Sequence, residues 1–374
     1  MRRLTRAAAF AGVAGAVIAC VLVVRQSNTG VAIAPVGRAL TGRSSPTRAA
    51  LRVLSAGPHG DASRVALRPG SAGVIQRALA GEAVRVAAQY GTVQVAVWLP
   101  GSPAPLLAGQ DLRLEMRLWS LSKPLVAFTL LRADATAGAD DAGLAPYLER
   151  SLDRSDNCAQ RYLTLRLQDA TGGITSAALS LAQTLRSDGG ELDVSHAQTD
   201  TLGSACVSSS YAGLPTSYVP RRALLVGTAT WTITDAVRFA RSLTVSTNAG
   251  TPAATASAKV LALMRHAKES SIEPGAGALT APLDWGAGEA FSAPCWRVAW
   301  KAGWGGAAAH IPWLGSQLGV VTLPGGQPLA FAVAVHPYDQ PPDDDPGLTT
   351  APAGVTAMLS ALRGALTSVG QSCS

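Results

Sequence analysis

Residues 120–135 read SLSKPLVAFTLLRADA, an apolar stretch with helical periodicity that opens with a serine and a lysine three residues apart. Pro124 fits a helix only in its first turn, which places the helix start at about Ser120. Helix positions three apart share one face, so the hydroxyl of Ser120 and the amine of Lys123 are predicted to lie within hydrogen-bond reach. This is the only Ser-x-x-Lys sequence in the chain.

Lysine is rare in this chain, which has only four lysines beside 27 arginines. An arginine side chain keeps its proton in proteins, whereas a lysine removed from water can lose it and act as a base. Lys123 is therefore a candidate general base, and Ser120 is its candidate nucleophile. The start of the predicted helix also brings partial positive charge to the position where an oxyanion forms beside Ser120.

Two further motifs contain side chains suited to acyl transfer. A Ser-Asp-Asn sequence at 155–157 starts 35 residues after Ser120, and a Lys-Ala-Gly sequence at 301–303 ends an apolar strand pattern. Taken alone, the first is typical of a helix cap or turn and the second of a strand end. Gly303 also leaves room for a ligand to lie against the strand. The order and setting of the three motifs together indicate one site.

Strand patterns lie on both sides of a helical middle part. The predicted helices are at 120–135, 143–168, 175–186 and 232–243. The predicted strands are at 92–99, with a partner near Leu106, and at 296–300, 318–323 and 329–335. A hairpin turn at Gly325-Gly326 and a closing helix over 351–369 complete the pattern. The predicted fold class is therefore α+β, with an antiparallel sheet built from both chain ends and an inserted helical subdomain.

The composition excludes disorder throughout and gives no support for nucleic-acid binding. The 374 residues are 48% apolar and 15% charged, which suffices for a folded core. The formal charge of +7 is unevenly distributed: residues 1–78 carry a net charge of +10 and the remaining residues a net charge of −3. The predicted domain is thus slightly acidic, and the basic excess belongs to the N-terminal part.

The N-terminal part has the features of a membrane segment followed by a linker. Residues 7–24 are uncharged and lie between three arginines and Arg25. Eighteen helical residues span roughly 27 Å, close to the thickness of a hydrocarbon core. Residues 1–25 are predicted to be a signal anchor or a cleaved signal peptide, with lipidation at Cys20 as a further alternative. Residues 26–79, rich in Pro, Ser and Arg, are predicted to be a tether.

Four cysteines follow Cys20, and an even number in an exported chain predicts two disulfides. Three pairings are possible. We favour Cys158–Cys206, which lies within one segment, and Cys295–Cys373, which fastens the C-terminus. No Cys-x-x-Cys or His-rich spacing indicates zinc, so neither a metal nor another cofactor is expected.

In this order, the three motifs resemble those of the penicillin-recognising serine enzymes, which include class A β-lactamases and D,D-peptidases. The resemblance covers about residues 80–370. It implies a β-lactamase/transpeptidase-like domain at 80–371, with its sheet part at 80–117 and 291–371 and its helical part at 118–290.

The resemblance implies a catalytic role for four residues. Ser120 is expected to be the nucleophile and Lys123 the general base. Ser155 is expected to relay a proton to the leaving nitrogen, and Lys301 to supply positive potential for a substrate carboxylate.

Three further residues are implied to bind the substrate. Asn157 is expected to hold the substrate amide, Gly303 to let the ligand lie against the strand, and Trp304 to complete an oxyanion hole with the backbone N–H of Ser120. Ala302 departs from the family pattern, which has a hydroxyl residue here, and this weakens the expected recognition of penicillin.

The glutamate that deacylates class A β-lactamases has no clear counterpart. The only Glu between Ser155 and Lys259 is Glu191, and it lacks the family's sequence context. The 35-residue gap from Ser120 to Ser155 is also shorter than usual, which implies a trimmed helical subdomain and a more open cleft.

The sequence therefore predicts an exported serine acyl-transferring hydrolase, with D-alanyl cell-wall peptides or related amides as substrates. One alternative is a true class A-like β-lactamase, and another is a catalytically idle module that binds the cell wall. The expected partners are a cell-wall peptide or a β-lactam, and the membrane through the N-terminal segment. The expected state is a monomer, placed on the outer face of the cell membrane or secreted.

Overall fold

The computed structural model describes residues 67–137, 141–195, 197–201, 206, 221–245, 250–265, 285–305, 314–338 and 347–373. All of them belong to one compact unit, His59–Ser374. The predicted membrane segment at 1–25, Cys20 and the tether up to residue 66 lie outside the described residues. Among the helices that are described, none is both long and apolar enough to cross a membrane.

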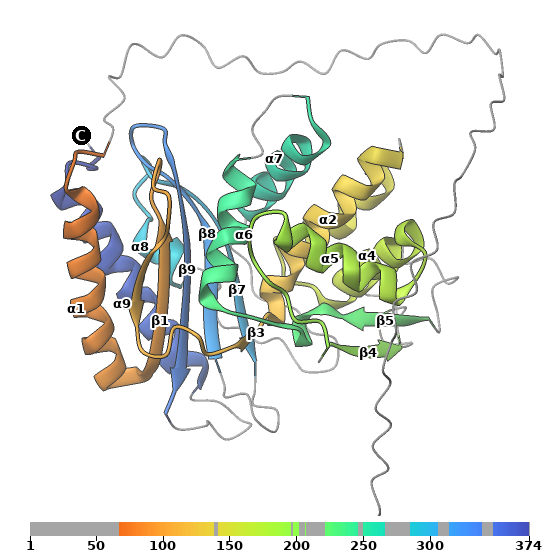
Figure 1. Cartoon of the computed structure of the whole chain (residues 1–374), viewed down its shortest axis with the longest axis horizontal. Coiled ribbons are helices and arrows are strands. Elements are labelled where there is room, and N and C mark those ends of the chain that lie inside the picture. Colours follow the sequence, from red (N-terminus) through yellow and green to blue (C-terminus); the bar gives the residue numbers. More distant parts are fainter. Residues whose placement is uncertain are drawn as a thin grey trace, which may run out of the picture. The chain divides into compact units, whose positions relative to one another are not determined.

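A five-stranded antiparallel sheet is assembled from both ends of the domain (Figure 1). In spatial order its strands are β2 (Leu106–Gly109), β1 (Gly91–Trp98), β9 (Pro328–Pro337), β8 (Leu314–Thr322) and β7 (Arg297–Gly305). Strand β1 pairs with β9 along its whole length, so the first strand lies beside the last. The predicted α+β class, the predicted strands and the hairpin between β8 and β9 are confirmed.

Helices cover both faces of this sheet, because the strand residues alternate between two hydrophobic clusters. Val93, Val95 and Val97 of β1 face one cluster, which is covered by α1 (Ser71–Tyr90), α8 (Ala287–Ala290) and α9 (Gly347–Ser368). Figure 1 shows α1 and α9 together on that face. The other face packs against α6 (Ile233–Val245) and continues into the helical part.

The helical part is built around α2 (Ser122–Ala137), which packs against α4 (Asn157–Thr171) and α7 (Pro252–Met264). Helix α2 is apolar on several faces, and Leu125, Val126 and Phe128 are buried, as expected of a helix inside a core. Helices α3 (Ala145–Leu152) and α5 (Ile174–Arg186) pack around it. The predicted helix at 120–135 is confirmed, with a 3₁₀ turn, η1 (Trp119–Leu121), before it.

Several elements differ from the predictions. The single helix predicted over 143–168 is wrong, because the chain leaves α3 at Leu152 and starts α4 at Asn157. Helix α7 and the short strands had no prediction. The strands are β3 (Met116–Arg117), which pairs with β6 (Thr230–Trp231), and β4 (Gln198–Thr201), which pairs with β5 (Arg222–Leu225). Two further 3₁₀ turns are η2 (Asp141–Leu144) and η6 (Val226–Thr228).

The predicted boundary between tether and domain at residue 80 is corrected by helix α1, which begins at Ser71. Ile75, Leu79 and Val86 are buried on one side of this helix, against α9 and the sheet. These residues recur at helical spacing, so the helix could have been found in the sequence. The last part of the predicted tether therefore belongs to the domain.

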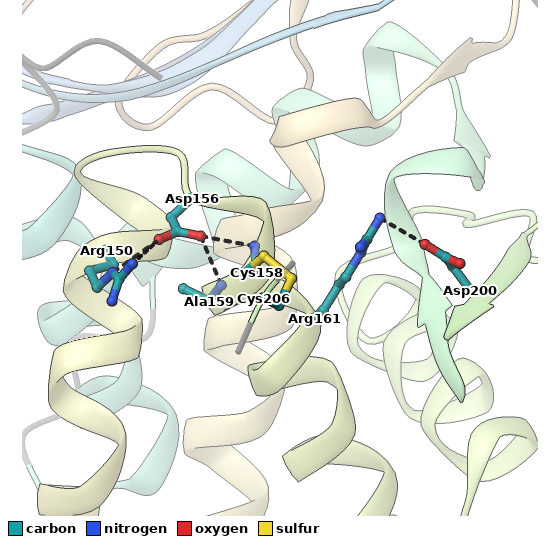
Figure 2. The surroundings of a disulfide bond; sticks show 7 residues. All are labelled: Arg150, Asp156, Cys158, Ala159, Arg161, Asp200 and Cys206. Carbon is teal, nitrogen blue, oxygen red and sulfur yellow. Dashed lines mark hydrogen bonds and ion pairs between the residues drawn. A yellow bond between two sulfur atoms is a disulfide. The ribbon is translucent and has the colours of Figure 1, made fainter. Parts of the chain in front are cut away.

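Both favoured disulfides are present. Cys158–Cys206 joins the first turn of α4 to a residue 48 positions later, and Cys295–Cys373 joins the segment before β7 to the C-terminal tail. Figure 2 shows the first of them beside the start of α4. The first disulfide thus closes a long loop in the helical part, and the second closes a long loop that includes β7, β8, β9 and α9.

Peptide mapping of the oxidised protein should recover these two pairs and no crossed pair. Replacing Cys295 and Cys373 by serine should lower the free energy of unfolding by up to about 4.5 kcal/mol, since the cross-link closes a long loop in the unfolded chain. Urea unfolding measures this loss. Crossed pairing, or a double variant as stable as the parent, would contradict the assignment.

Candidate active site

Ser120 lies in the 3₁₀ turn η1, directly before α2 and beside strand β7. The turn is closed by the N–H of Leu121, which donates to the carbonyl oxygen of Leu118 at 2.8 Å. It packs so closely on β7 that a Cβ atom at Gly303 would lie 2.9 Å from the Leu121 side chain, and one at Gly305 would overlap the Trp119 ring. Glycine at these two positions lets β7 approach the serine.

The amine of Lys123 is surrounded by four oxygen atoms. Its side chain is 1% exposed, and Nζ lies 2.7 Å from Ser120 Oγ and 2.7 Å from Asn157 Oδ1. It also lies 2.8 Å from the carbonyl oxygen of Ser155 and 3.0 Å from Ser155 Oγ. An ammonium group has three protons, so it cannot donate to all four oxygens at once. This contact set therefore suits an amine that exchanges protons with the two hydroxyls.

Ser155 Oγ is the junction of the site. It lies 3.1 Å from Ser120 Oγ and accepts from Lys301 Nζ at 2.8 Å. The backbone of Ser155 has a φ of 54°, a left-handed conformation that is costly for a residue with a Cβ atom. The surrounding turn must therefore hold the hydroxyl in this position.

The side chain of Asp156 stabilises this turn. It accepts from the N–H groups of Cys158 at 2.8 Å and Ala159 at 3.0 Å, which caps α4. It also forms an ion pair with Arg150, whose Nη2 lies at 2.8 Å (Figure 2). The cap separates α3 from α4 and places the residues on either side of Asp156 beside Lys123.

Lys301 brings a second buried amine to the same hydroxyl. Its side chain is 2% exposed. Burial lowers the pKa of Lys301 well below its usual range, and repulsion by Lys123 adds to this effect while Asp153 opposes it. Lys301 therefore loses its proton more easily than an exposed lysine, and its amine lies within hydrogen-bond distance of Ser155 Oγ.

A pocket of about 360 Å³ opens beside Ser120. It is lined by Trp119, Ser120, Asn157, Gln160, Arg161, Thr164, Leu224, Leu225, Val226, Gly227, Thr228, Trp304 and Gly305. One face of α4 contributes four of these residues, at 157, 160, 161 and 164. Their helical spacing starts at the Ser-Asp-Asn motif, so this face could have been found in the sequence. No aspartate or glutamate is among the described residues that line this pocket.

The structure thus links most of the predicted site residues. Ser120, Lys123, Ser155, Asn157 and Lys301 form one hydrogen-bonded group, and Trp304 lines the pocket.

Gly303, and the two positions at which the sequence departs from the family pattern, Ala302 and Glu191, do not line the pocket. The space left by Gly303 is filled by the turn that carries Ser120. Ala302 packs into the cluster on the opposite face of the sheet. Glu191 is exposed, and its backbone N–H donates to Asp235. Within the described ranges, no group of three His, Cys, Asp or Glu side chains could hold a metal ion.

Comparison with known proteins identifies the fold. No family model and no curated protein match the sequence. A class A β-lactamase from Bacteroides cellulosilyticus superposes with a TM-score of 0.51 and 15% identity, over 79% of this chain and 99% of the other.

Two further solved structures are similar. A chromosome-encoded β-lactamase of Vibrio parahaemolyticus gives a TM-score of 0.49 and 15% identity, over 79% of this chain and 100% of that one. A class A β-lactamase from Mycobacterium abscessus gives a TM-score of 0.48 and 16% identity, over 76% of this chain and 98% of that one. The Bacteroides enzyme shows that this chain has the β-lactamase-like fold, as the motifs predicted.

Replacing Lys301 by methionine should make the protein more stable at neutral pH, because the variant no longer buries an amine. Between the lowered pKa of Lys301 and the ordinary lysine value of about 10.4, the unfolded parent chain binds more protons than the folded one, so Lys301 makes stability rise with pH. The advantage of the variant should therefore shrink as the pH approaches about 10. Urea unfolding of both proteins across this range measures it. A constant difference in unfolding free energy would contradict the assignment.

Proposed function

We propose that this chain is a serine acyl-transferring hydrolase that works through an acyl-enzyme on Ser120. The observation that supports this most strongly is the contact of the buried Lys123 amine with both hydroxyls, Ser120 and Ser155. The proposed substrates are D-alanyl cell-wall peptides or related amides, in agreement with the motif resemblance.

Acylation in this site requires two proton transfers. The reactive form of the site is proposed to be the one in which Lys123 has lost its proton. Ser120 Oγ then attacks the acyl carbon while its own proton passes to the Lys123 amine, and the carbonyl oxygen becomes an oxyanion. When the C–N bond breaks, Ser155 gives its proton to the leaving nitrogen and takes one from the ammonium of Lys123. The products are an ester on Ser120 and a free amine, and both side chains return to their starting protonation.

Binding roles follow from the positions of the remaining groups. The N–H groups of Ser120 and Trp304 are proposed to bind the oxyanion, beside the start of α2, whose partial positive charge favours it. Asn157 is proposed to hold the substrate amide. A carboxylate near Lys301 would favour the charged amine, so binding of an anionic substrate should raise the pKa of Lys301 again.

Hydrolysis of the ester needs a base that activates water. No carboxylate is among the described residues lining the pocket. This favours slow hydrolysis of a penicilloyl ester, whose leaving group stays attached to the acyl part, and so supports a D-alanyl peptidase or acyltransferase over a β-lactamase. The β-lactamase remains the first alternative. The idle binding module, which the sequence suggested from Ala302, is the second alternative, although the Ala302 side chain faces the core on the other side of the sheet. Two disulfides are typical of oxidising compartments, and this supports the proposed export.

Labelled penicillin should form one adduct per protein molecule, attached to Ser120, because the lactam carbonyl is an acyl group that the nucleophile can attack. Intact-mass measurement followed by peptide mapping detects it, and Ser120→Ala should abolish it without loss of fold. An adduct on Ser120→Ala would refute the nucleophile. Steady consumption of penicillin above about 1 s⁻¹ would identify a β-lactamase instead.

Lys123→Arg should slow acylation by about 10²-fold or more, because arginine keeps the charge but cannot accept the serine proton. Lys259→Arg is the matched control, since Lys259 lies on α7 outside the site, and its rate should equal that of the parent. Stopped-time mass spectrometry of the adduct gives both rates. Equal rates in the two variants would show that another group is the base.

A further inference from the structure

One face of helix α4 carries polar side chains from the nucleophile into the pocket. Asn157, Gln160, Arg161 and Thr164 follow each other on this face, and all four line the pocket. Arg161 is the only charged side chain among the described lining residues. It lies four positions beyond Asn157, which corresponds to about 6 Å along the helix axis. A cation is therefore placed one helical turn beyond the residue proposed to hold the substrate amide.

The guanidinium of Arg161 is partly occupied by an ion pair that leaves room for a second anion. Its Nη2 atom lies 2.8 Å from Oδ2 of Asp200 on β4, and the two side chains are 31% and 44% exposed (Figure 2). Ion pairs at this exposure contribute little stability, so Asp200 is replaceable by a ligand. A guanidinium carries five N–H donors in one plane, so it can hold both oxygens of a carboxylate at the same time.

The pocket lining also includes apolar residues, namely Leu224, Leu225, Val226 and Trp304. An acyl chain that starts at Ser120 can contact this apolar part of the lining while its polar end reaches the face of α4. The pocket thus combines apolar surface with one cation in the same cavity as the reacting serine.

We propose that Arg161 selects acyl donors that carry a carboxylate on the acyl side chain, about one helical turn beyond the amide that Asn157 is proposed to hold. The inference rests on the proposed function, since it names the substrate class of that same site. In the free protein Asp200 holds Arg161 in place and competes with the substrate carboxylate. The two residues therefore have opposite effects on selectivity.

The test uses two acyl thioesters with the same scissile bond, one ending in a carboxylate and the other in the matching carboxamide. The ratio of their acylation rates is measured by intact mass for the parent, Arg161→Gln and Asp200→Asn. Arg161→Gln should lower the preference for the carboxylate by about 10-fold or more, as expected for a lost charge-assisted contact. Asp200→Asn should raise that preference.

Arg221→Gln is the matched control, because Arg221 also forms an exposed ion pair with α4, through Asp169, but does not line the pocket. Its ratio should equal that of the parent. If Arg161 and Asp200 only fasten β4 to α4, both variants will change the two rates equally, and the proposal is overturned. An unchanged ratio in Arg161→Gln overturns it as well.

A binding measurement separates this proposal from the proposed function. Calorimetry on Ser120→Ala compares the free acid products of the two thioesters, a dicarboxylate and its carboxamide analogue, and needs no chemistry. Preference for the dicarboxylate that disappears in Ser120→Ala/Arg161→Gln supports the role of Arg161 even if the parent forms no acyl-enzyme. Equal binding of the two acids in Ser120→Ala refutes it even if the parent is acylated.

Discussion

Two buried amines share one hydroxyl in this protein, and the rest of the site depends on that arrangement. Ser155 Oγ lies 3.0 Å from the amine of Lys123 and 2.8 Å from that of Lys301. Burying two amines side by side is costly, because each loses water and the charged forms repel each other. The sheet, the central helix and the turn between α3 and α4 each bring one partner to this point, and their packing must offset the cost.

Two residues near Ser155 Oγ have backbone conformations that are unfavourable by themselves. Trp119, the residue before Ser120, and Ser155, whose hydroxyl contacts Ser120 Oγ, both have positive φ values, 43° and 54°. Such conformations persist where the surrounding structure holds them, and they are common at functional sites. Here Asp156 holds one turn through its cap and ion pair, and the glycines of β7 make room for the other. The support of the site is thus distributed over three elements far apart in the sequence.

The sequence predicted the reacting groups better than it predicted their support. The three motifs and the main strands follow from residue spacing, and both disulfide pairs were favoured correctly. The break between α3 and α4 was missed although residues 153–157 are all polar and the Ser-Asp-Asn sequence within them is a recognisable cap. Helix α1 was missed because its first half was assigned to the tether, although Ile75, Leu79 and Val86 recur at helical spacing. Arg161 was missed because an arginine on a helix is usually a solvent-exposed charge, and only the pocket shows what it faces.

The protonation of Lys301 in the folded protein tests the central claim most directly. The chain has only four lysines, so ¹⁵N labelling of the lysine side chains gives a spectrum of four Nζ signals, and the one absent from Lys301→Met is Lys301. A titration of the folded protein should show this signal changing well below the ordinary lysine pKa of about 10.4, because burial and Lys123 disfavour the charged amine. A Lys301 signal that titrates at or above the ordinary value would mean that the two amines are not held together, away from water, on Ser155.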